Sequence, residues 1–301
     1  MKTHKCDVCG RFIALLFAAH FLLSCGGADG NGGVGRAAHR DSAALKIALL
    51  PTTYNLPLFV AAERGIFARH GVAVELAVFK ASMDCDTAFM GVSADVIATD
   101  AVKAAWMESR GVELSEASAA AVPWTLVAGK STRVKSAKQL ADKNIAMARN
   151  SVSDYLTRKL LDSIRVKTAA YPVQVNDLDI RLGMLLNGEL DAAWLPEPYA
   201  AAALAKGHTK VLSAADGWGC PGVLAFKGKA ADGRMGKFIE AYDEACDSLN
   251  TKGVAAYGCL LEKHSNTGAA VPGKNGKIVF KKWSKPGAGI LERARKFVGK
   301  T

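Results

Sequence analysis

Short apolar strands alternate with amphipathic helices from Leu45 onward, and this order restricts the chain to an α/β fold. The first apolar run is Leu45–Leu50, and Leu56–His70 follows with apolar residues at helical spacing until Gly71. The first series then continues with a strand at Val72–Phe79, a helix at Asp84–Met90, a strand at Val96–Thr99 and a helix capped by Asp100. This alternation predicts a parallel sheet covered by helices.

A second series of the same kind begins with an apolar strand at Trp124–Ala128. Its further expected elements are helices at Ser136–Asp142, Ser151–Asp162 and Asp177–Leu186, and strands at Asn144–Ala148, Pro172–Val175, Asp191–Leu195 and Lys210–Ser213. A strand at Val223–Phe226 and helices near Arg234–Leu249 and Val254–Leu261 follow. Two chain crossings, near Val122–Lys130 and Leu212–Gly222, would join the series. The chain is therefore expected to form two lobes with a cleft between them.

The first residues have the layout of a secretory signal peptide. A basic start precedes an apolar run, Phe12–Leu23, which spans about 18 Å as a helix and is too short for a hydrocarbon core of about 30 Å. Leu22-Leu23-Ser24-Cys25 resembles the lipobox of bacterial lipoproteins, in which the cysteine is acylated. We predict a signal peptide at residues 1–24, lipidation of Cys25 and a flexible linker at residues 25–44; ordinary cleavage without lipid is the alternative.

The net charge of +11 is concentrated at the end of the chain. Nine Lys or Arg residues and one Glu lie between Pro272 and Thr301, whereas the body before this segment is nearly neutral. An exported protein does not meet nucleic acid, so this composition predicts no nucleic-acid partner. The basic tail would face anionic lipid or form a solvated surface.

Four cysteines remain after the leader and Cys25 are set aside. An even number in an oxidising compartment is consistent with disulfides, and four cysteines permit three pairings. The pair in neighbouring helical segments, Cys246 with Cys259, is favoured over Cys85 with Cys220, and buried thiols are an equal alternative.

Several segments resemble the periplasmic substrate-binding proteins of ABC importers, especially the branch that captures nitrate, sulfonates, taurine and thiamine-pyrimidine precursors. The resemblance covers Leu45 to Leu249, and the tail beyond Val271 carries no such motif. The matching segments are Leu45–Pro51, Pro57–Phe67, His70–Leu76, Ala98–Asp100, Val134–Leu140, Asn144–Ala146 and Gly188–Tyr199.

The resemblance implies the two-lobed periplasmic binding protein fold (type II), an α/β architecture whose lobes are joined by a two-strand hinge. Residues 45–126 and 214–301 would form lobe 1, with the basic tail, and residues 127–213 would form lobe 2. It also implies a monomer that binds a small-molecule ligand and an ABC transporter permease. The lipid on Cys25 would anchor it to the cell membrane or outer membrane, facing the periplasm or the exterior.

Ligands of open α/β sheets bind beyond the carboxyl ends of strands, where helix N-termini offer free amides. Asp100 would accept from an amine or only cap its helix, and Arg149 with nearby amides would hold an anion or only form a surface cap. The candidate ligand-binding residues are Thr52, Thr53, Tyr54, Asn55, Thr99, Asp100, Arg149, Asn150, Ser151, Trp194, Glu197 and Trp218. An ordinary strand–helix loop, or core packing of the tryptophans, is the alternative for each.

Aromatic residues near the expected cleft suit a flat, partly apolar ligand. Trp124, Trp194, Trp218 and Tyr54 would stack on it, and carboxylates would accept from its amino groups. We therefore predict a heteroaromatic compound similar to a thiamine precursor, with sulfonate, taurine or nitrate next.

The sequence carries no signature of catalysis. There is no His/Cys spacing typical of zinc, no G-x-S-x-G elbow and no phosphate-binding loop, so we predict no metal, no cofactor and no enzyme activity. Two alternatives remain open: a ligand sensor of the same fold, and an enzyme similar to a thiamine-pyrimidine synthase, whose clustered cysteines are not seen here.

Overall fold

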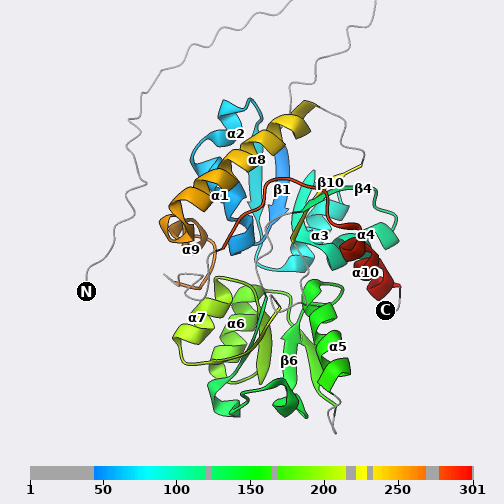
Figure 1. Ribbon diagram of the computed structural model, residues 1–301, viewed down its shortest axis with the longest axis vertical. Coiled ribbons are helices and arrows are strands. Elements are labelled where there is room, and N and C mark those ends of the chain that lie inside the picture. Colours follow the sequence, from blue (N-terminus) through cyan, green and yellow to red (C-terminus); the bar gives the residue numbers. More distant parts are fainter. Residues whose placement is uncertain are drawn as a thin grey trace, which may run out of the picture. The chain divides into compact units, whose positions relative to one another are not determined.

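The computed structural model describes residues 44–118, 124–164, 169–214, 222–228, 233–268 and 278–299. The predicted signal peptide, the lipidation site Cys25 and the candidate site residue Trp218 lie outside these ranges. The described ranges contain two five-stranded sheets with covering helices (Figure 1). No helix within them is long and apolar enough to cross a membrane.

The first sheet has the strand order β2-β1-β3-β10-β4. Strand β1 pairs in parallel with β2 and β3, whereas β10 runs antiparallel to both of its neighbours. The predicted parallel arrangement is confirmed for β1, β2 and β3, and β10 enters this sheet in the antiparallel direction on the chain's return from the other lobe. The bounds are β1 (Leu45–Leu49), β2 (Val74–Val78), β3 (Val96–Asp100), β4 (Leu114–Ser118) and β10 (Gly222–Lys227).

The second sheet repeats this arrangement in the order β7-β6-β8-β5-β9, with β5 as the antiparallel strand. The first strand after each crossing therefore runs against its sheet, an internal similarity that the sequence does not reveal. The predicted lobe boundary after residue 126 falls inside β5. The bounds are β5 (Thr125–Ala128), β6 (Asn144–Met147), β7 (Tyr171–Gln174), β8 (Ala192–Leu195) and β9 (Thr209–Ser213).

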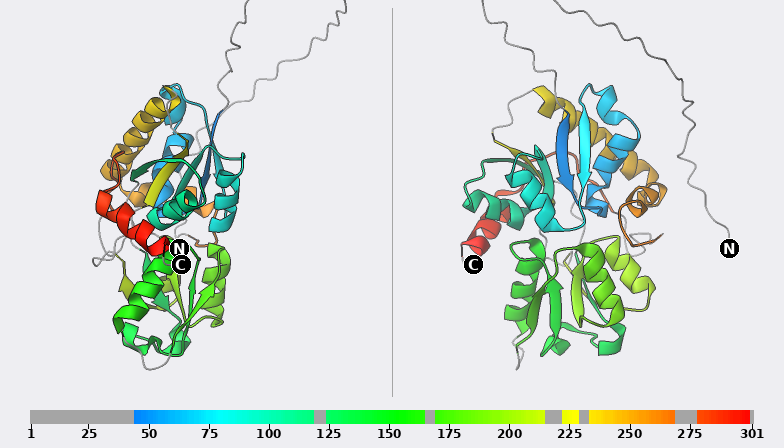
Figure 2. Two further views of the ribbon diagram at one scale, coloured as in Figure 1. Left: turned by 90° about the vertical axis from the view of Figure 1, so that its right-hand side faces the viewer. Right: turned by 180° about the vertical axis from the view of Figure 1, so that it is seen from behind.

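Helices cover both faces of the first sheet. Helix α8 (Gly233–Lys252) lies with α1 (Leu56–Glu63) and α2 (Ile66–Arg69) on one face, and α3 (Ser82–Met90) lies on the opposite face (Figure 2). The predicted single helix at Leu56–His70 is wrong, because Gly65 interrupts it with φ of 63°, a left-handed conformation that favours glycine. Helix α4 (Ala101–Ser109) begins at its cap Asp100, as predicted.

The second sheet is covered by α5 (Val152–Ile164), α6 (Leu178–Asn187) and α7 (Tyr199–Ala205). Asp177 caps α6 and Gly188 ends it with φ of 79°, which confirms the predicted bounds of this helix to within a residue. The predicted helix at Ser136–Asp142 is a 3₁₀ turn, η3 (Ala137–Leu140). The remaining short elements are the 3₁₀ helices η1 (Thr53–Asn55), η2 (Lys130–Thr132) and η4 (Val254–Ala256) and the α-helix α9 (Cys259–Glu262). The predicted helix at Val254–Leu261 is thus divided into η4 and α9.

The basic C-terminal segment includes a helix, α10 (Ala288–Val298), that packs against α4. Arg295 donates from two guanidinium nitrogens to Glu108 of α4, at 2.8 and 2.9 Å. Phe297 reaches α5 of the second lobe, where its ring meets Tyr155 edge to face with centroids 5.3 Å apart. This part of the basic tail is therefore a packed helix.

Cys246 and Cys259 are not joined by a disulfide, contrary to the favoured pairing. Cys246 is buried on α8 within the core, and burial raises the pKa of its thiol to about 12. Cys85 is also a buried thiol. Cys220 lies outside the described ranges.

Candidate functional site

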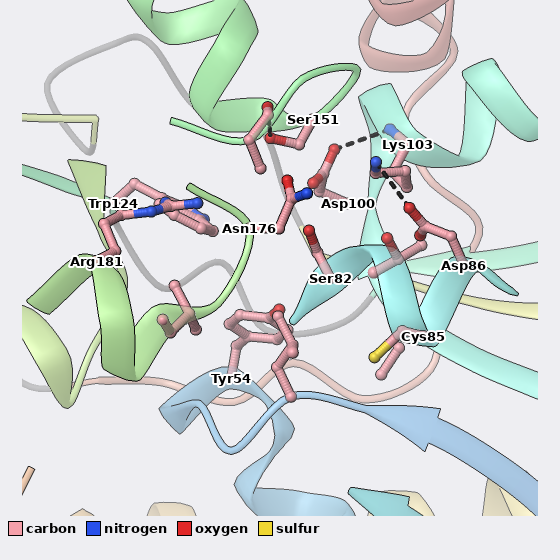
Figure 3. A pocket seen from close by; sticks show the side chains of 15 residues that line it. Tyr54, Ser82, Cys85, Asp86, Asp100, Lys103, Trp124, Ser151, Asn176 and Arg181 are labelled. Carbon is pink, nitrogen blue, oxygen red and sulfur yellow. Dashed lines mark hydrogen bonds and ion pairs between the residues drawn. The ribbon is translucent and has the colours of Figure 1, made fainter. Parts of the chain in front are cut away.

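A cavity lies where the carboxyl ends of β1 and β3 face the loops of the second sheet (Figure 3). Arg181 and Trp124 lie on one side of it, Asp100, Lys103 and Asp86 lie on the other, and Asn176 and Ser82 lie between (Figure 3). The further side chains that line it include Leu50, Tyr54, Cys85, Thr99, Ser151 and Leu178. Residues of both lobes thus share one cavity.

The lobes contact each other beside this cavity. Ala81 and Asp177 form an isolated antiparallel β-bridge, and the Leu178 amide donates to the Lys80 carbonyl at 3.1 Å. The Lys80 ammonium also lies 3.2 Å from Asp179. The cavity volume is ≈ 30 Å³, room for about one or two water molecules, whereas small-molecule pockets usually measure about 300–1,000 Å³. An organic solute would therefore need the lobes to move apart.

Asp100 connects the two lobes at the cavity. Its Oδ1 accepts from the amides of Val102 and Lys103, at 3.0 and 2.9 Å, and so caps α4. The same oxygen accepts from the Val152 amide at the start of α5, at 3.1 Å. Burial raises the pKa of Asp100, although these amide bonds oppose the shift. A first-lobe carboxylate therefore occupies the N-terminus of a second-lobe helix.

Lys103 forms a buried ion pair with Asp86. The Lys103 Nζ lies 2.8 Å from Asp86 Oδ2, and both side chains are more than nine-tenths buried. The ammonium also donates to the Arg149 carbonyl of the second lobe at 3.2 Å. Burial raises the pKa of Asp86, and Lys103 opposes this shift. The charge of Lys103 is therefore compensated inside the protein.

Arg181 is buried to 99 % of its surface, and within the described ranges the hydrogen bonds of its guanidinium go to carbonyl groups. Nε and Nη2 donate to the Val175 carbonyl, and Nη1 donates to the Trp194 carbonyl at 2.9 Å. Among the described residues no carboxylate forms an ion pair with it. Burial lowers the pKa of Arg181 to about 10, and nearby Asp177 opposes the shift. The cavity therefore contains a cation that has no ion-paired carboxylate among the described residues.

Uncharged groups complete the lining. Burial raises the pKa of Tyr54, so its phenol stays protonated and can act as a donor. The Ser82 Oγ is buried and has no hydrogen-bond partner among the described residues. Trp124 lies immediately before β5 and offers an aromatic surface. These groups can donate hydrogen bonds to a ligand and stack on a flat ring.

Four of the predicted residues, Tyr54, Thr99, Asp100 and Ser151, line the cavity together. The Ser151 hydroxyl donates to the Ala148 carbonyl at 2.7 Å. Ser151 thereby shapes the turn before α5. These four residues lie at the ends of β1, β3 and β6 or in the turns that follow them, so the strand-end rule selected side chains that line this cavity.

Other predicted residues act through their main chain or lie in the core. The Thr53 amide donates to the Glu197 carbonyl at 2.8 Å, which joins the segment after β1 to the segment after β8, and the Glu197 carboxylate also accepts from the Ala201 amide. Arg149 contributes its carbonyl, and its side chain is exposed. Trp194 is fully buried in the second-lobe core.

The last three described candidates have local roles. Thr52 is fully buried, and the Asn55 side-chain Nδ2 donates to the Leu50 carbonyl at 2.8 Å. Asn150 has φ of 55°, a left-handed conformation that asparagine tolerates, and its main-chain amide donates to Asp154. None of the three lines the cavity.

Sequence reasoning missed several residues that line the cavity. Asn176 follows β7, and Ser82 and Asp86 lie in α3 after β2, but neither of these two strand ends was among the predicted sites. Lys103 and Arg181 each place a cation on the apolar stripe of a predicted helix, and that anomaly could have identified them. Within the described ranges no group of three or more His, Cys, Asp or Glu side chains could hold a metal ion.

A model of the NMT1-like family matches residues 38–218, more than half of the chain. No curated protein matches the chain in sequence. The family match includes both cavity walls, from Tyr54 to Arg181.

Solved structures share the fold at low identity. The periplasmic aliphatic sulphonate binding protein SsuA of Escherichia coli has 15% sequence identity and a TM-score of 0.67, covering 85% of this chain and 87% of that one. The nitrate-binding protein NrtA of Synechocystis PCC 6803 has 13% identity and a TM-score of 0.67, covering 81% and 76%. A zinc-bound ligand-binding component of an ABC-type import system from Staphylococcus aureus has 14% identity and a TM-score of 0.68, covering 86% and 92%. The chain therefore has the two-lobed fold of periplasmic binding proteins.

Proposed function

Because the chain belongs to the NMT1-like family, we propose that it is an extracytoplasmic solute-binding protein that delivers a small molecule to an ABC transporter permease. The observation that carries this proposal is the cavity at the carboxyl ends of the strands, lined from both lobes. A solute that touches both walls favours a form in which the lobes close around it, with more space between them than the cavity of ≈ 30 Å³ provides, by its higher affinity for that form. This mechanism requires no chemical change in the solute.

Of the residues predicted from sequence, we propose that Tyr54, Thr99, Asp100 and Ser151 contact the solute. The others support them: Thr53, Arg149 and Glu197 make main-chain contacts between the lobes, and Trp194 holds the second-lobe core. Trp218 lies outside the described ranges and stays a prediction.

Two solute classes fit different parts of the lining. Tyr54 and Trp124 support a flat heteroaromatic compound similar to a thiamine precursor, because both rings line the cavity. Arg181 supports a compound with a sulfonate-type group, because the buried guanidinium has no carboxylate partner among the described residues. A single solute that carries both a ring and an anionic group would satisfy both walls.

The experiment that tests the function uses the protein purified from its own cells. Small molecules released by denaturation are identified by mass spectrometry, and calorimetry with each pure compound then measures its affinity. Binding of an unchanged compound supports the proposal. Release of a chemically altered compound supports the enzyme alternative, and unaffected solute uptake by cells that lack the protein supports the sensor.

The proposal includes an anchor, because Cys25 follows a lipobox-like segment and precedes a Gly-rich linker. Cys25→Ser should move the protein from the membrane fraction to the soluble extracytoplasmic fraction, and growth with labelled palmitate should label only the unmodified sequence. Membrane association that survives Cys25→Ser would contradict the anchor and leave the solute-binding proposal untouched.

A further inference from the structure

Arg181 differs from Lys103, the other buried cation of the cavity. Lys103 has Asp86 at 2.8 Å, whereas the described residues give Arg181 only the carbonyls of Val175 and Trp194. A guanidinium carries five N–H donors, and these contacts use three of them. Two of the five N–H groups therefore have no acceptor among the described residues, and Arg181 is one of the side chains that line the cavity.

The first-lobe side of the cavity provides a second, independent observation, a hydroxyl group without a hydrogen-bond partner among the described residues. The Ser82 Oγ at the start of α3 is buried and has no partner among the described residues. A buried hydroxyl without a partner costs free energy, so a ligand acceptor at this point would be favourable. Ser82 and Arg181 line the same cavity, with Asn176 between them (Figure 3).

On the basis of the proposed function, we propose that the solute carries a carboxylate or sulfonate group and that Arg181 and Ser82 together bind this group. We call the pair the oxyanion corner. The planar guanidinium offers two N–H groups to one anion, and the Ser82 hydroxyl donates to another oxygen of that anion. Because Arg181 belongs to the second lobe and Ser82 to the first, the anion connects the lobes.

The two other groups at the cavity that could attract an anion, a helix N-terminus and an ammonium group, already contact a carboxylate of the protein. The α5 N-terminal amide of Val152 donates to Asp100, and the Lys103 ammonium pairs with Asp86. A solute anion at either place would have to displace an internal carboxylate. The oxyanion therefore belongs at Arg181, where no carboxylate of the described residues competes.

The test compares anionic and neutral molecules of nearly equal shape. Calorimetry at constant ionic strength measures the affinity of the full chain for benzenesulfonate against benzenesulfonamide, and for nicotinate against nicotinamide. The anionic member of at least one pair should bind more tightly by about 10- to 100-fold, the effect of hydrogen bonds to a charged group. Equal affinity within each pair, or binding of no anion at millimolar concentration, overturns the oxyanion corner.

Three variants locate the effect. Ser82→Ala should lower the affinity for the anion by about tenfold while leaving the thermal stability unchanged or raised, because it removes a buried hydroxyl that has no partner. Arg181→Lys keeps the charge but loses the planar pair of donors, so it should reduce the difference within each pair. The control is Lys138→Met, which replaces an exposed second-lobe lysine. It should change neither the affinity for the anion nor the thermal stability.

The outcomes separate this inference from the proposed function. Loss of affinity in Ser82→Ala and Arg181→Lys, but not in Lys138→Met, supports the corner. A neutral solute that co-purifies and binds equally well to all three variants overturns the corner while solute binding stands. Absence of any bound solute from the native protein overturns the proposed function itself.

Discussion

The two walls of the cavity differ in how their buried charges are compensated. On the first-lobe wall, Lys103 pairs with Asp86 and Asp100 accepts three amides, so each charged group has a partner. On the second-lobe wall, the part of the chain that the structure describes gives Arg181 only carbonyl acceptors. The first wall therefore compensates its buried charges internally, whereas the charge on the second wall has no paired carboxylate among the described residues, and the proposed oxyanion corner depends on that difference.

The largest effect is expected when one partner of the buried ion pair on the first-lobe wall is removed. Asp86→Ala leaves Lys103 as a buried, uncompensated cation, and we expect the free energy of unfolding to fall by about 3–5 kcal/mol. Urea unfolding followed by circular dichroism measures the change. The double variant Asp86→Leu with Lys103→Met removes both charges and should recover most of the loss.

Two results would break this part of the comparison. A small effect of Asp86→Ala, below about 1 kcal/mol as for a surface pair, would mean that the ammonium finds water or another acceptor. A double variant as unstable as the single one would mean that Asp86 contributes packing or other contacts beyond the ion pair.

The next prediction concerns Asp100, which connects the walls. Asp100→Ala removes the acceptor for three amides, and we expect it to lower the free energy of unfolding by about 1–2 kcal/mol, the usual effect of losing a helix cap. Asp100→Asn retains a side-chain oxygen and should lose much less. Urea unfolding of both variants measures the difference.

The same pair of variants tests the link between the lobes. Fluorescence transfer between dyes on exposed sites, Lys138 on the second lobe and Lys252 on the first, reports the distance between the lobes. Asp100→Ala should increase the share of the open form because the contact to Val152 is lost. An unchanged distance distribution would limit Asp100 to capping α4.

The fold was largely predictable because it depends on local patterns. Gly188 after an amphipathic helix, and Asp100 before one, fixed helix ends that the structure confirms. The antiparallel directions of β5 and β10 were not predictable, because they arise from chain crossings between distant segments. Likewise, α10 lies beyond the segments that resemble a known family.

The residues that line the cavity were predicted from the sequence only where they lie at or just after the end of a strand. Tyr54, Asp100 and Ser151 follow strands and line the cavity, whereas Arg181 lies in the second turn of α6. Its orientation depends on the carbonyls of Val175 and Trp194, which come from two other segments. A sequence alone does not show which buried cation has a partner.

A smaller effect is expected at the outer contact between the lobes. Phe297 of α10 meets Tyr155 edge to face, with ring centroids 5.3 Å apart, and the Arg158 guanidinium lies 5.5 Å from the Phe297 ring. A double-mutant cycle with Phe297→Ala and Tyr155→Ala should give a coupling energy of about 0.5–1.5 kcal/mol by urea unfolding. No coupling would mean that this contact does not help to hold the two walls together.

The smallest effect is expected for a partly exposed ion pair, which sharpens the contrast with the buried pair of the first wall. His70 lies 2.8 Å from Glu244 and 3.4 Å from Glu240, and the hydrogen bond to Glu244 raises its pKa above the ordinary 6.5. A raised pKa in the folded state stabilises the fold fully below the unfolded pKa, and this stabilisation is lost as the pH rises through the folded pKa. His70→Gln should therefore lower the free energy of unfolding near pH 5.5 by less than about 1 kcal/mol, because solvent screens the pair, and should have no effect near pH 9. Urea unfolding at both pH values measures the difference; an equal loss at both would assign the role of His70 to packing rather than charge.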